Sequence, residues 1–443
     1  MESVLTRKTI ATYAVGSLGT GGFATLPGLV LVIYMTDTLG IAALAAGILV
    51  TVAKVWDVII DPVIGARSDR SLALRGSRRP FMVVGALALP VFFILTFAVP
   101  GGTPPLVAGI WVLVAFLITA TAFSLFQVPY IALPAELARG YDDRTKLISA
   151  RVVVLTLAIL LFGGGAPEIQ KAFADPYTGY LVMAVVAGIL IGGGMLVSSF
   201  VAKRGEPVPV ESFSILDNYR TGIAALRRSQ PFRSLLATFL LQGLATGLML
   251  AGAAYLSKWV LGTGVTVLFI SLIAPAILFA PVWAIISRRI GKERAFTIAS
   301  ILFGVAALSM VALLWYPGEW VYAPVALAGA GYAGMQSLPM SMLPDVISHD
   351  AERTGPGSAG TFGGVWTAGE TTGMALGSTV LTIVLAASGY LESVATVTVE
   401  QPASAIAGII LAFSIVPAVI IGLSLVTFAR YPLRKADIDA AVR

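Results

Sequence analysis

Long apolar runs separated by short polar stretches dominate the sequence of this chain. A membrane-spanning helix requires about 20 consecutive residues that are mostly apolar. Twelve runs meet this requirement, and we expect each of them to form a transmembrane helix. The predicted spans cover residues 9–35, 42–66, 80–100, 104–137, 147–172, 178–203, 232–260, 263–288, 295–316, 320–347, 357–387 and 403–429.

Positively charged residues concentrate in the connections on one side of these spans. They are Arg67, Arg70, Arg75, Arg78 and Arg79 after the second span, Arg139, Arg144 and Lys146 after the fourth, and Arg288, Arg289, Lys292 and Arg294 after the eighth. The opposite connections, such as 100–105 and 316–319, contain almost no positive charge. Because cytoplasmic loops are enriched in Lys and Arg, we expect a multi-pass protein of the inner cell membrane with both termini in the cytoplasm.

The longest polar interval, residues 203–233, divides the predicted spans into two groups of six. Within it, residues 219–228 have the pattern of a short amphipathic helix lying at the membrane surface. We therefore expect an N-terminal six-helix bundle over 1–203 and a cytoplasmic linker over 204–231. A C-terminal six-helix bundle with a short cytoplasmic tail would then occupy 232–443.

The two halves repeat each other in sequence, with matches that keep their order along the chain. The matching pairs are Asp61-Pro62-Val63 with Ala280-Pro281-Val282, Ser68-Asp69-Arg70 with Ser287-Arg288-Arg289, 75–81 with 290–296, Pro129 with Pro339, Leu133-Pro134 with Leu343-Pro344, and 143–145 with 352–354. The repeat predicts an all-α membrane protein whose twelve transmembrane helices form two pseudo-symmetric six-helix bundles.

Composition excludes several classes of protein. Only 12% of the 443 residues are charged and 57% are hydrophobic, whereas a soluble domain has about 25% charged residues. A cytosolic enzyme, a secreted disulfide scaffold and a disordered chain are therefore excluded. The chain has no cysteine and one histidine, His349, so thiolate catalysis is excluded and a histidine-ligated metal is not expected. Cytoplasmic loops account for the net charge of +6, and we expect no nucleic-acid partner and no cofactor.

Two carboxylates, Asp57 and Asp61, lie inside the apolar second span. Like charges four residues apart on a helix repel each other, and a charge in the bilayer core costs at least about 2.5–3.5 kcal/mol. A bound Na⁺ or a proton would relieve this cost, since carboxylate oxygens suit hard cations. Alternatively, Lys54 neutralises one carboxylate in a static ion pair. The equivalent positions in the second half, Ala276 and Ala280, favour a coupling role over a structural one.

The residues around this pair resemble a known family. The motifs are Trp56-Asp57-x3-Asp61-Pro62-x2-Gly65-x2-Ser68-Asp69-Arg70, Gly76-x-Arg78-Arg79-Pro80, Tyr34-Met35-Thr36-Asp37-Thr38-Leu39-Gly40, Val128-Pro129-Tyr130-x2-Leu133-x2-Glu136, Tyr255-Leu256-x-Lys258-x-Val260-Leu261-Gly262 and Leu343-Pro344-Asp345-x4-Asp350-x2-Arg353-Thr354-Gly355. Through them, the chain resembles the glycoside–pentoside–hexuronide cation symporters of the major facilitator superfamily, the family of the bacterial melibiose carrier. The resemblance extends over most of the predicted spans.

The resemblance implies roles for four residues. Asp57 and Asp61 match the family's cation-binding acids, and Ser124 stands where a hydroxyl ligand from the fourth span would help to bind the ion. Arg151 matches a family arginine near the substrate. The substrate pocket departs from the family, because its sugar-holding aspartates fall on Gln127 and near Gly21, and its lysine of the eleventh span falls near Thr371.

Glu370 is a further acid inside an apolar span. It could face a central cavity and bind substrate or a proton, or pair with Arg151, or it could hydrogen-bond between helices as a structural residue. Other candidate substrate residues, each also compatible with plain packing, are Gln127, Tyr130, Gln242, Gln336, Trp366 and Thr371.

Charged residues at the predicted cytoplasmic helix ends form a candidate gate. We expect them to make salt bridges between helices that latch the outward-facing state. The candidate gate residues are Asp69, Arg70, Arg78, Arg79, Asp345 and Arg353, with Asp350 in the same role.

These features predict a secondary active transporter in which Na⁺ or H⁺ drives the symport of a small organic solute by alternating access. The resemblance implies a sugar or glycoside. Animal lysolipid carriers are similar to this family, so a lysolipid or another amphipathic solute is an alternative, and a proton-driven exporter would use the same fold. We expect no enzymatic activity, and we expect a monomer in the lipid bilayer.

Overall fold

The computed structural model of the chain describes residues 6–137, 141–202, 224, 226–354, 359–395 and 399–433. The described residues are almost entirely helical, with one isolated antiparallel bridge between Leu39 and Val394. Most of the predicted amphipathic helix at 219–228 lies outside the described residues.

The chain divides into two compact units. Unit 1 comprises Met1–Ile215 together with Glu392–Val399, and unit 2 comprises Leu216–Leu391 together with Glu400–Arg443. The division at 215/216 falls inside the predicted linker. The short segment Glu392–Val399 differs from the prediction, because it belongs to unit 1 although both of its chain neighbours belong to unit 2.

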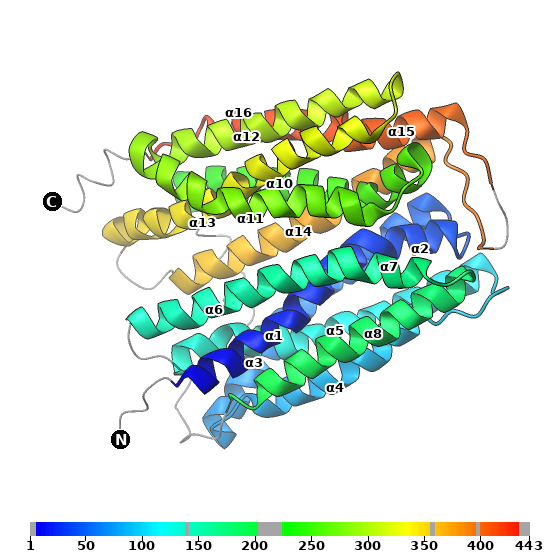
Figure 1. The fold of residues 1–443 in the computed structure, drawn as a ribbon. Coiled ribbons are helices and arrows are strands. Elements are labelled where there is room, and N and C mark those ends of the chain that lie inside the picture. The colour runs from blue at the N-terminus through cyan, green and yellow to red at the C-terminus, as the bar shows by residue number, and fades with distance from the viewer. Residues whose placement is uncertain are drawn as a thin grey trace. The chain divides into compact units, whose positions relative to one another are not determined.

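The helices of unit 1 are the blue to green ribbons of Figure 1. They are α1 (Arg7–Leu26), α2 (Val32–Asp37), α3 (Ala43–Arg75), α4 (Arg79–Thr96), α5 (Pro105–Leu137), α6 (Tyr141–Leu160), α7 (Ala166–Lys171) and α8 (Pro176–Ser199). A π-helical turn at Pro27–Leu31 joins α1 to α2, and another at Leu161–Gly165 joins α6 to α7. Each of these pairs therefore forms one continuous span.

Unit 2 has the corresponding set of helices. They are α10 (Gln230–Tyr255), extended by a π-helical turn at Leu256–Leu261, α11 (Val265–Ile290), α12 (Lys292–Ser309), extended by a 3₁₀ turn at Met310–Leu314, α13 (Tyr322–Thr354), which follows a 3₁₀ turn at Glu319–Val321, α14 (Ala359–Ala387), α15 (Ala403–Phe413) and α16 (Ile415–Phe428). The predicted span 403–429 is interrupted at Ser414, which separates α15 from α16.

Eleven helical segments among the described residues are long and apolar enough to cross a membrane. They coincide with eleven of the twelve predicted spans. The remaining prediction, 320–347, falls in α13, a continuous helix of 33 residues. At about 1.5 Å per residue this helix is long enough to span a bilayer, but Tyr332, Gln336 and Pro339 make it less apolar than the others.

The two units pack their helices in the same pattern, which supports the predicted pseudo-symmetry. In unit 1, α1 packs on α6 and α8, α4 packs on α5 and α8, and α3 packs on α5. The corresponding contacts of unit 2 are α10 with α14 and α16, α12 with α13 and α16, and α11 with α13. Each unit therefore has the helix arrangement expected for one of two pseudo-symmetric six-helix bundles.

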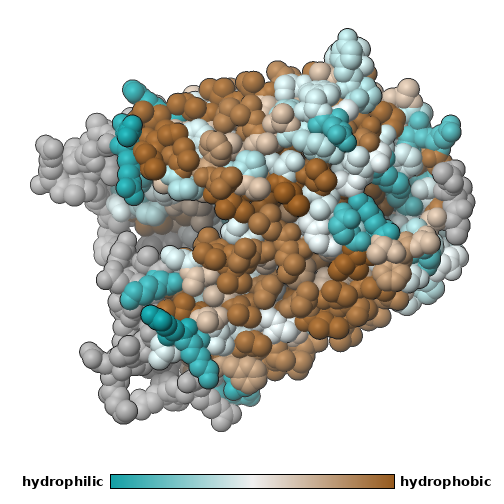
Figure 2. Space-filling model, viewed as in Figure 1, coloured by the Kyte–Doolittle hydropathy of each residue, from teal (hydrophilic) through white to brown (hydrophobic). Residues whose placement is uncertain are grey.

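Apolar side chains cover much of the outer surface of the helices. Leu44, Ile48 and Val55 of α3 and Val84 and Leu87 of α4 are each about half exposed. Figure 2 shows the same character as a broad brown surface, with hydrophilic residues gathered mainly towards the ends of the helices. A soluble protein rarely exposes so large an apolar surface, whereas hydrocarbon chains of a bilayer cover it favourably.

Local sequence explains where several helices begin and end. Asp175 caps α8 by accepting hydrogen bonds from the backbone N–H groups of Tyr177 and Thr178. The Thr178 hydroxyl also donates to the Asp175 carboxylate, and this bond holds the pKa of Asp175 below its usual value. Gly76, with φ 66°, ends α3 in the left-handed conformation that glycine adopts most readily.

Close approach of α10 and α14 depends on glycines facing each other. A Cβ atom on Gly247 would lie 2.1 Å from the carbonyl oxygen of Met374, and one on Gly377 would lie 2.3 Å from the backbone nitrogen of Leu248. Small residues allow the backbones of two membrane helices to pack at this distance. The glycine richness of the spans therefore has a direct structural role at this crossing.

We predict that Gly247→Ala destabilises the protein by about 1–3 kcal/mol, as expected for overpacking a close contact. Gly193→Ala is a matched control, because a Cβ atom there meets nothing within 4 Å. Thermal unfolding of the purified variants in detergent measures both effects. Equal midpoints for the two variants would contradict the packing role of Gly247.

Candidate functional site

The paired acids Asp57 and Asp61 lie one turn apart on α3, facing α5. The Asp57 carboxylate accepts a hydrogen bond from Lys54, with 3.1 Å between Nζ and Oδ2. The Asp61 carboxylate is instead hydrogen-bonded to the hydroxyl of Ser124 on α5, a side chain that is only 3% exposed. Ser124 therefore lies beside the acid pair.

Each carboxylate retains an oxygen atom without a partner. The Oδ1 atoms of Asp57 and Asp61 are both buried and accept no hydrogen bond in the structure. Next to Asp57, the indole N–H of Trp56 donates to the hydroxyl of Thr121 at 2.8 Å. Thr121 lies one turn before Ser124, so this bond joins α3 to α5 beside the acids. The acid pair is thus a group of buried oxygen atoms with unused acceptor capacity.

Lys54 neutralises only part of this charge. The expected alternative of an ion pair between Lys54 and Asp57 is present, but two carboxylates and one ammonium leave a formal net charge of −1 if both acids are ionised. One monovalent cation would make the group neutral. Buried charge without compensation is costly in a membrane, so the arrangement favours binding a single Na⁺ or a single proton.

A second polar cluster in unit 1 surrounds Arg151 on α6. Its guanidinium lies 5.3 Å from the ring centroid of Tyr130, within range of a cation–π contact, and it also interacts with the Tyr13 side chain. The Tyr13 and Tyr130 rings stack at 4.7 Å, and the Tyr130 hydroxyl donates to the Tyr13 carbonyl and lies 3.0 Å from the Ser17 hydroxyl. Gln127 lies one turn before Tyr130 and has a buried, unpartnered Oε1 atom.

In unit 2, Glu370 on α14 is half-buried and interacts electrostatically with Tyr332 on α13. The amide of Gln336 donates to the Tyr332 hydroxyl at 3.2 Å, so the structure joins these two residues of α13 by a hydrogen bond. The hydroxyl of Thr371 is used within its own helix, where it donates to the carbonyl of Thr367.

Two candidate substrate residues, Gln242 and Trp366, are buried and make contacts between helices. Gln242 is 2% exposed, and its amide donates to the hydroxyls of Ser300 and Ser424 at 2.9 and 3.4 Å. Trp366 is also 2% exposed, stacks on Phe239 and donates its indole N–H to the sulfur of Met340. These contacts favour the packing alternative for both residues, while the Oε1 of Gln242, like that of Gln127, is buried without a partner.

The candidate gate residues of unit 1 gather where α3 ends and α4 begins. Arg78 forms an ion pair with Asp69 and donates to Ser68 at 3.1 Å, while Arg79 lies over the Phe200 ring at 4.4 Å. Arg70 is exposed. The Asp69–Arg78 pair thus fixes one helix end within a single unit.

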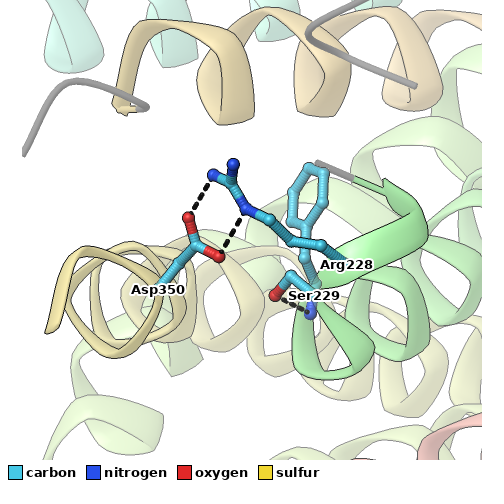
Figure 3. Close-up of polar contacts among 4 residues, drawn as sticks. Arg228, Ser229 and Asp350 are labelled. Carbon is cyan, nitrogen blue, oxygen red and sulfur yellow. Dashed lines mark hydrogen bonds and ion pairs between the residues drawn. The ribbon is translucent and has the colours of Figure 1, made fainter. Parts of the chain in front are cut away.

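The gate candidates of unit 2 also pair within their unit. Asp345 on α13 accepts a hydrogen bond from Lys292 at 2.6 Å. Asp350 accepts two hydrogen bonds from Arg228, at 3.0 Å from Nε and 2.5 Å from Nη2, next to the cap that Ser229 provides for α10 (Figure 3). The side chain of Arg353 lies outside the described residues.

Several residues of these clusters were missed by sequence reasoning. Tyr13 and Ser17 have the four-residue spacing of one helix face, and this polar pair in an apolar span was a usable signal. Tyr332 has the same spacing relative to Gln336. No sequence signal connects Arg228 to Asp350, because the two residues lie more than a hundred positions apart.

A family model described as "MFS/sugar transport protein" matches residues 12–435. The chain belongs to this family, and it is a membrane transporter rather than an enzyme. The resemblance to the glycoside–pentoside–hexuronide cation symporters is confirmed.

Curated relatives match along most of the chain. An uncharacterized symporter of Synechocystis is 24% identical, covering 96% of this chain and 94% of its own length. A glucuronide carrier protein homolog of Escherichia coli is 23% identical, and the match covers 98% of this chain and 94% of the relative. The mouse sodium-dependent lysophosphatidylcholine symporter 1 is 25% identical, and the match covers 75% of this chain and 68% of the relative.

Solved structures agree on the fold. A proton-dependent oligopeptide transporter superposes with a TM-score of 0.70 at 14% identity, covering 96% of this chain and 98% of its own. A D-xylose–proton symporter superposes with a TM-score of 0.67 at 13% identity, covering 96% and 97%. At these identities the likeness establishes the major facilitator fold alone.

The packing of Gln242 generates a test of its role. We predict that Gln242→Leu leaves solute uptake unchanged and alters the free energy of unfolding by less than about 1 kcal/mol, because Ser300 and Ser424 keep their own backbone hydrogen bonds. Gln127→Leu, in the Arg151 cluster, is the comparison that should reduce uptake. Loss of uptake in Gln242→Leu, with stability retained, would contradict the packing role and would support a role of Gln242 in substrate binding.

Proposed function

We propose that this protein is a symporter in which one Na⁺ or one H⁺, bound at Asp57 and Asp61, drives uptake of a sugar-like solute. Binding of the cation removes the residual charge of the acid group and favours solute binding in the same unit. The loaded carrier then changes the side of the membrane on which it is open, as the family fold allows. Coupling is the reciprocal effect of each ligand on the affinity for the other.

The observation that carries this proposal is the acid pair with two buried, unpartnered Oδ1 atoms. Asp57, Asp61 and the Ser124 hydroxyl supply oxygen ligands of the kind that hard cations prefer. Lys54 leaves the group one positive charge short of neutrality. A monovalent cation fits this deficit, and a proton on Asp61 fits it equally well.

Sugar-like solutes are supported by the family description and by the relative named as a glucuronide carrier homolog. The lysophosphatidylcholine symporter of mouse supports an amphipathic solute as the second candidate. We place the aromatic and polar side chains around Arg151, with Gln127 and Tyr130, at the solute site of unit 1. Glu370 and Gln336 are the corresponding candidates in unit 2.

We further propose that the protein lies in the inner membrane as a monomer, with its arginine-rich connections and both termini in the cytoplasm. In this orientation the Asp69–Arg78 and Asp345–Lys292 pairs stabilise the cytoplasmic ends of helices within each unit. They are candidates for contacts that change when the carrier opens to the cytoplasm.

We predict that Asp57→Asn and Asp61→Asn each reduce cation-driven uptake at least about tenfold, the equivalent of about 1.4 kcal/mol of lost coupling. Uptake in proteoliposomes is measured with a Na⁺ gradient at constant pH and, separately, with a pH gradient without Na⁺. The gradient that drives uptake identifies the coupling ion.

Asp175→Asn is the matched control, since it removes the same charge from an exposed helix cap where Asn is equally favourable. Its uptake should equal that of the unaltered protein. If both acid variants keep full gradient-driven uptake, the cation site lies elsewhere.

A further inference from the structure

A hydrogen bond beside the acid pair joins two residues that carry no charge, Trp56 on α3 and Thr121 on α5. The indole N–H of Trp56 donates to the Thr121 hydroxyl at 2.8 Å, and that hydroxyl donates in turn to the carbonyl of Leu117 at 2.8 Å. The Thr121 hydroxyl therefore accepts one bond and donates the other. In this way a side chain of α3 is linked to the backbone of α5.

Trp56 lies on an exposed face of α3. Its indole side chain is 37% exposed, and the same face carries apolar side chains at helical spacing that are 42–54% exposed, namely Val52, Val55 and Ile59. Hydrocarbon offers no acceptor for an indole N–H, and a polar group without a partner in apolar surroundings is costly. An apolar environment therefore favours the bond between Trp56 and Thr121.

The same two helices are also joined at the acid pair itself. Thr121 lies one turn before Ser124, whose hydroxyl is hydrogen-bonded to the Asp61 carboxylate, and Trp56 directly precedes Asp57. The bond between Asp61 and Ser124 involves the atoms that would bind the ion, so it depends on whether the site is occupied. The bond between Trp56 and Thr121 contains no titratable group, so it does not depend on occupancy.

The glycine contacts between α3 and α5 are apolar. A Cβ atom on Gly65 would lie 3.6 Å from the Cγ1 atom of Val128, and one on Gly109 would lie 3.7 Å from the Cδ1 atom of Leu49. Apolar contacts of this kind have no preferred direction, whereas a hydrogen bond requires a particular distance and angle. The bond between Trp56 and Thr121 therefore restricts how α3 and α5 can shift against each other next to Asp61 and Ser124.

We propose that Trp56 and Thr121 are positioning residues of the cation site, whose hydrogen bond sets the distance between Ser124 and Asp61 without touching the ion. This inference rests on the proposed function and adds two residues to the site of the coupling ion. Ligands that are already in place bind with less reorganisation. Loss of the bond should therefore weaken ion binding.

Thr121→Val tests the hydroxyl, because valine has a similar shape to threonine but accepts no hydrogen bond. Binding to the purified full chain is measured by calorimetry, with Na⁺ at constant pH and with H⁺ from the protons bound as the pH is lowered. The ion to follow is the one whose binding Asp61→Asn abolishes. Its dissociation constant should rise at least about threefold in Thr121→Val, as expected for one net hydrogen bond. Thr121→Ser keeps the hydroxyl and should restore ion binding.

Trp56→Phe removes the N–H group and keeps an aromatic ring, so it should weaken ion binding by a similar factor. Because the two residues act through one bond, the double variant should bind the ion no more weakly than the weaker single variant. Trp111→Phe is the matched control. Trp111 is 39% exposed, and its indole N–H donates to the carbonyl of Leu95 on α4 at 2.8 Å, nearer the start of α5. Ion binding in this control should be unchanged.

Unchanged ion binding in Thr121→Val, or equal weakening in Thr121→Ser, overturns the positioning role. A lower midpoint of thermal unfolding in Thr121→Val without weaker ion binding would show a purely structural role and overturns it as well. Failure of the proposed function is a distinct result, because Asp61→Asn would then leave the binding of both ions intact.

A second, independent observation concerns three aromatic side chains in the turn between α12 and α13. Trp315, Tyr316 and Trp320 are 68%, 73% and 40% exposed. The turn is ordered by its own hydrogen bonds, since the Tyr316 N–H donates to the carbonyl of Ala312 at 2.9 Å and the Trp320 indole N–H donates to the carbonyl of Tyr316 at 2.6 Å. Exposed apolar groups that cluster in this way mark an interaction surface.

The length of the span places these rings relative to a bilayer. Side chains on one face of α12 are 48–58% exposed and lead from its start towards the turn, namely Ile298, Ile301, Val305 and Leu308. At about 1.5 Å per residue in the α-helix and about 2.0 Å in the 3₁₀ turn, Arg294 and Trp315 lie about 34 Å apart along the span. The hydrocarbon core of a bilayer is about 30 Å thick. With Arg294 at one boundary of the core, Trp315 therefore lies at the other.

The chemistry of the turn fits the headgroup region better than either water or hydrocarbon. Trp and Tyr combine an apolar ring with a polar tip, and they are enriched at the boundary between lipid and water. Glu319 is exposed in the same turn, and burial of its carboxylate in hydrocarbon would be costly.

We propose that Trp315, Tyr316 and Trp320 anchor unit 2 in the phospholipid headgroup region at the end of α12 opposite to Arg294. The partner of this surface is the bilayer itself. The proposal does not depend on the solute or on the coupling ion.

The chain has no cysteine, so a single introduced thiol can carry a nitroxide label that reports its depth. Glu319→Cys keeps all three rings, and the labelled protein is placed in vesicles of phosphatidylethanolamine and phosphatidylglycerol. Collisions with oxygen, which concentrates in hydrocarbon, are compared with collisions with a water-soluble nickel chelate. Ala174→Cys, at an exposed position before α8, is the aqueous reference, and Val305→Cys is the hydrocarbon reference.

The label at position 319 should give a ratio of the two collision rates between those of the references. Adding Trp315→Ala and Tyr316→Ala should shift this ratio towards the aqueous reference, because the rings no longer hold the turn in the lipid. A ratio equal to that of Ala174→Cys, or one that the two alanine substitutions do not change, overturns the proposal. Shielding of the label from both reagents would show that protein covers the turn, and it overturns the proposal too.

Discussion

The structure depends on the electrostatic cost of placing Asp57 and Asp61 one turn apart in an apolar helix. Lys54 compensates one charge, and the Ser124 hydroxyl satisfies one oxygen of Asp61, but two oxygen atoms remain without partners. No rearrangement of neutral neighbours can remove the remaining charge, because only a cation can do so. We therefore propose that the acid group of unit 1 takes its additional positive charge from the coupling ion.

Contacts in the remainder of unit 1 hold α3 at three points along its length. Trp56 joins α3 to α5 beside the acids, the Asp69–Arg78 pair fixes the far end of α3, and Glu392 caps its start. A binding site that is already organised loses little affinity to reorganisation. The Arg151 cluster on α6 has the opposite charge and lies in the same unit.

The sequence alone predicted eleven spans that the structure confirms and the repeat of the two halves, and it singled out the acid pair. Apolar runs of about 20 residues have few alternatives to a membrane helix, and an acid in such a run stands out because lipid penalises it. Hydropathy did not indicate Ser124, because burying a hydroxyl in the membrane costs much less free energy than burying a charge. Ser124 was predicted only from the family resemblance. The predicted span 320–347 corresponds to α13, which is long enough to cross the bilayer although Gln336 and Pro339 make it less apolar than the other spans.

Contacts between distant segments could not be predicted. The sequence left Gln242 open between a substrate role and packing, and its hydrogen bonds to Ser300 and Ser424 on other helices favour packing. The assignment of Glu392–Val399 to unit 1 contradicts the order of the chain and follows from backbone hydrogen bonds that any sequence could make. The types of side chain along the sequence are enough to predict the helices and the charged sites. Contacts between loops cannot be predicted in this way, because they depend on the three-dimensional path of the backbone.

Direct measurement of cation stoichiometry tests the central claim most directly. Calorimetric titration of the purified protein with Na⁺ at two pH values, together with the protons taken up or released, counts the monovalent cations bound per chain. The account predicts one cation per chain, either Na⁺ or H⁺, and no such binding in Asp61→Asn. Binding of one cation per chain that persists in Asp61→Asn would contradict the account.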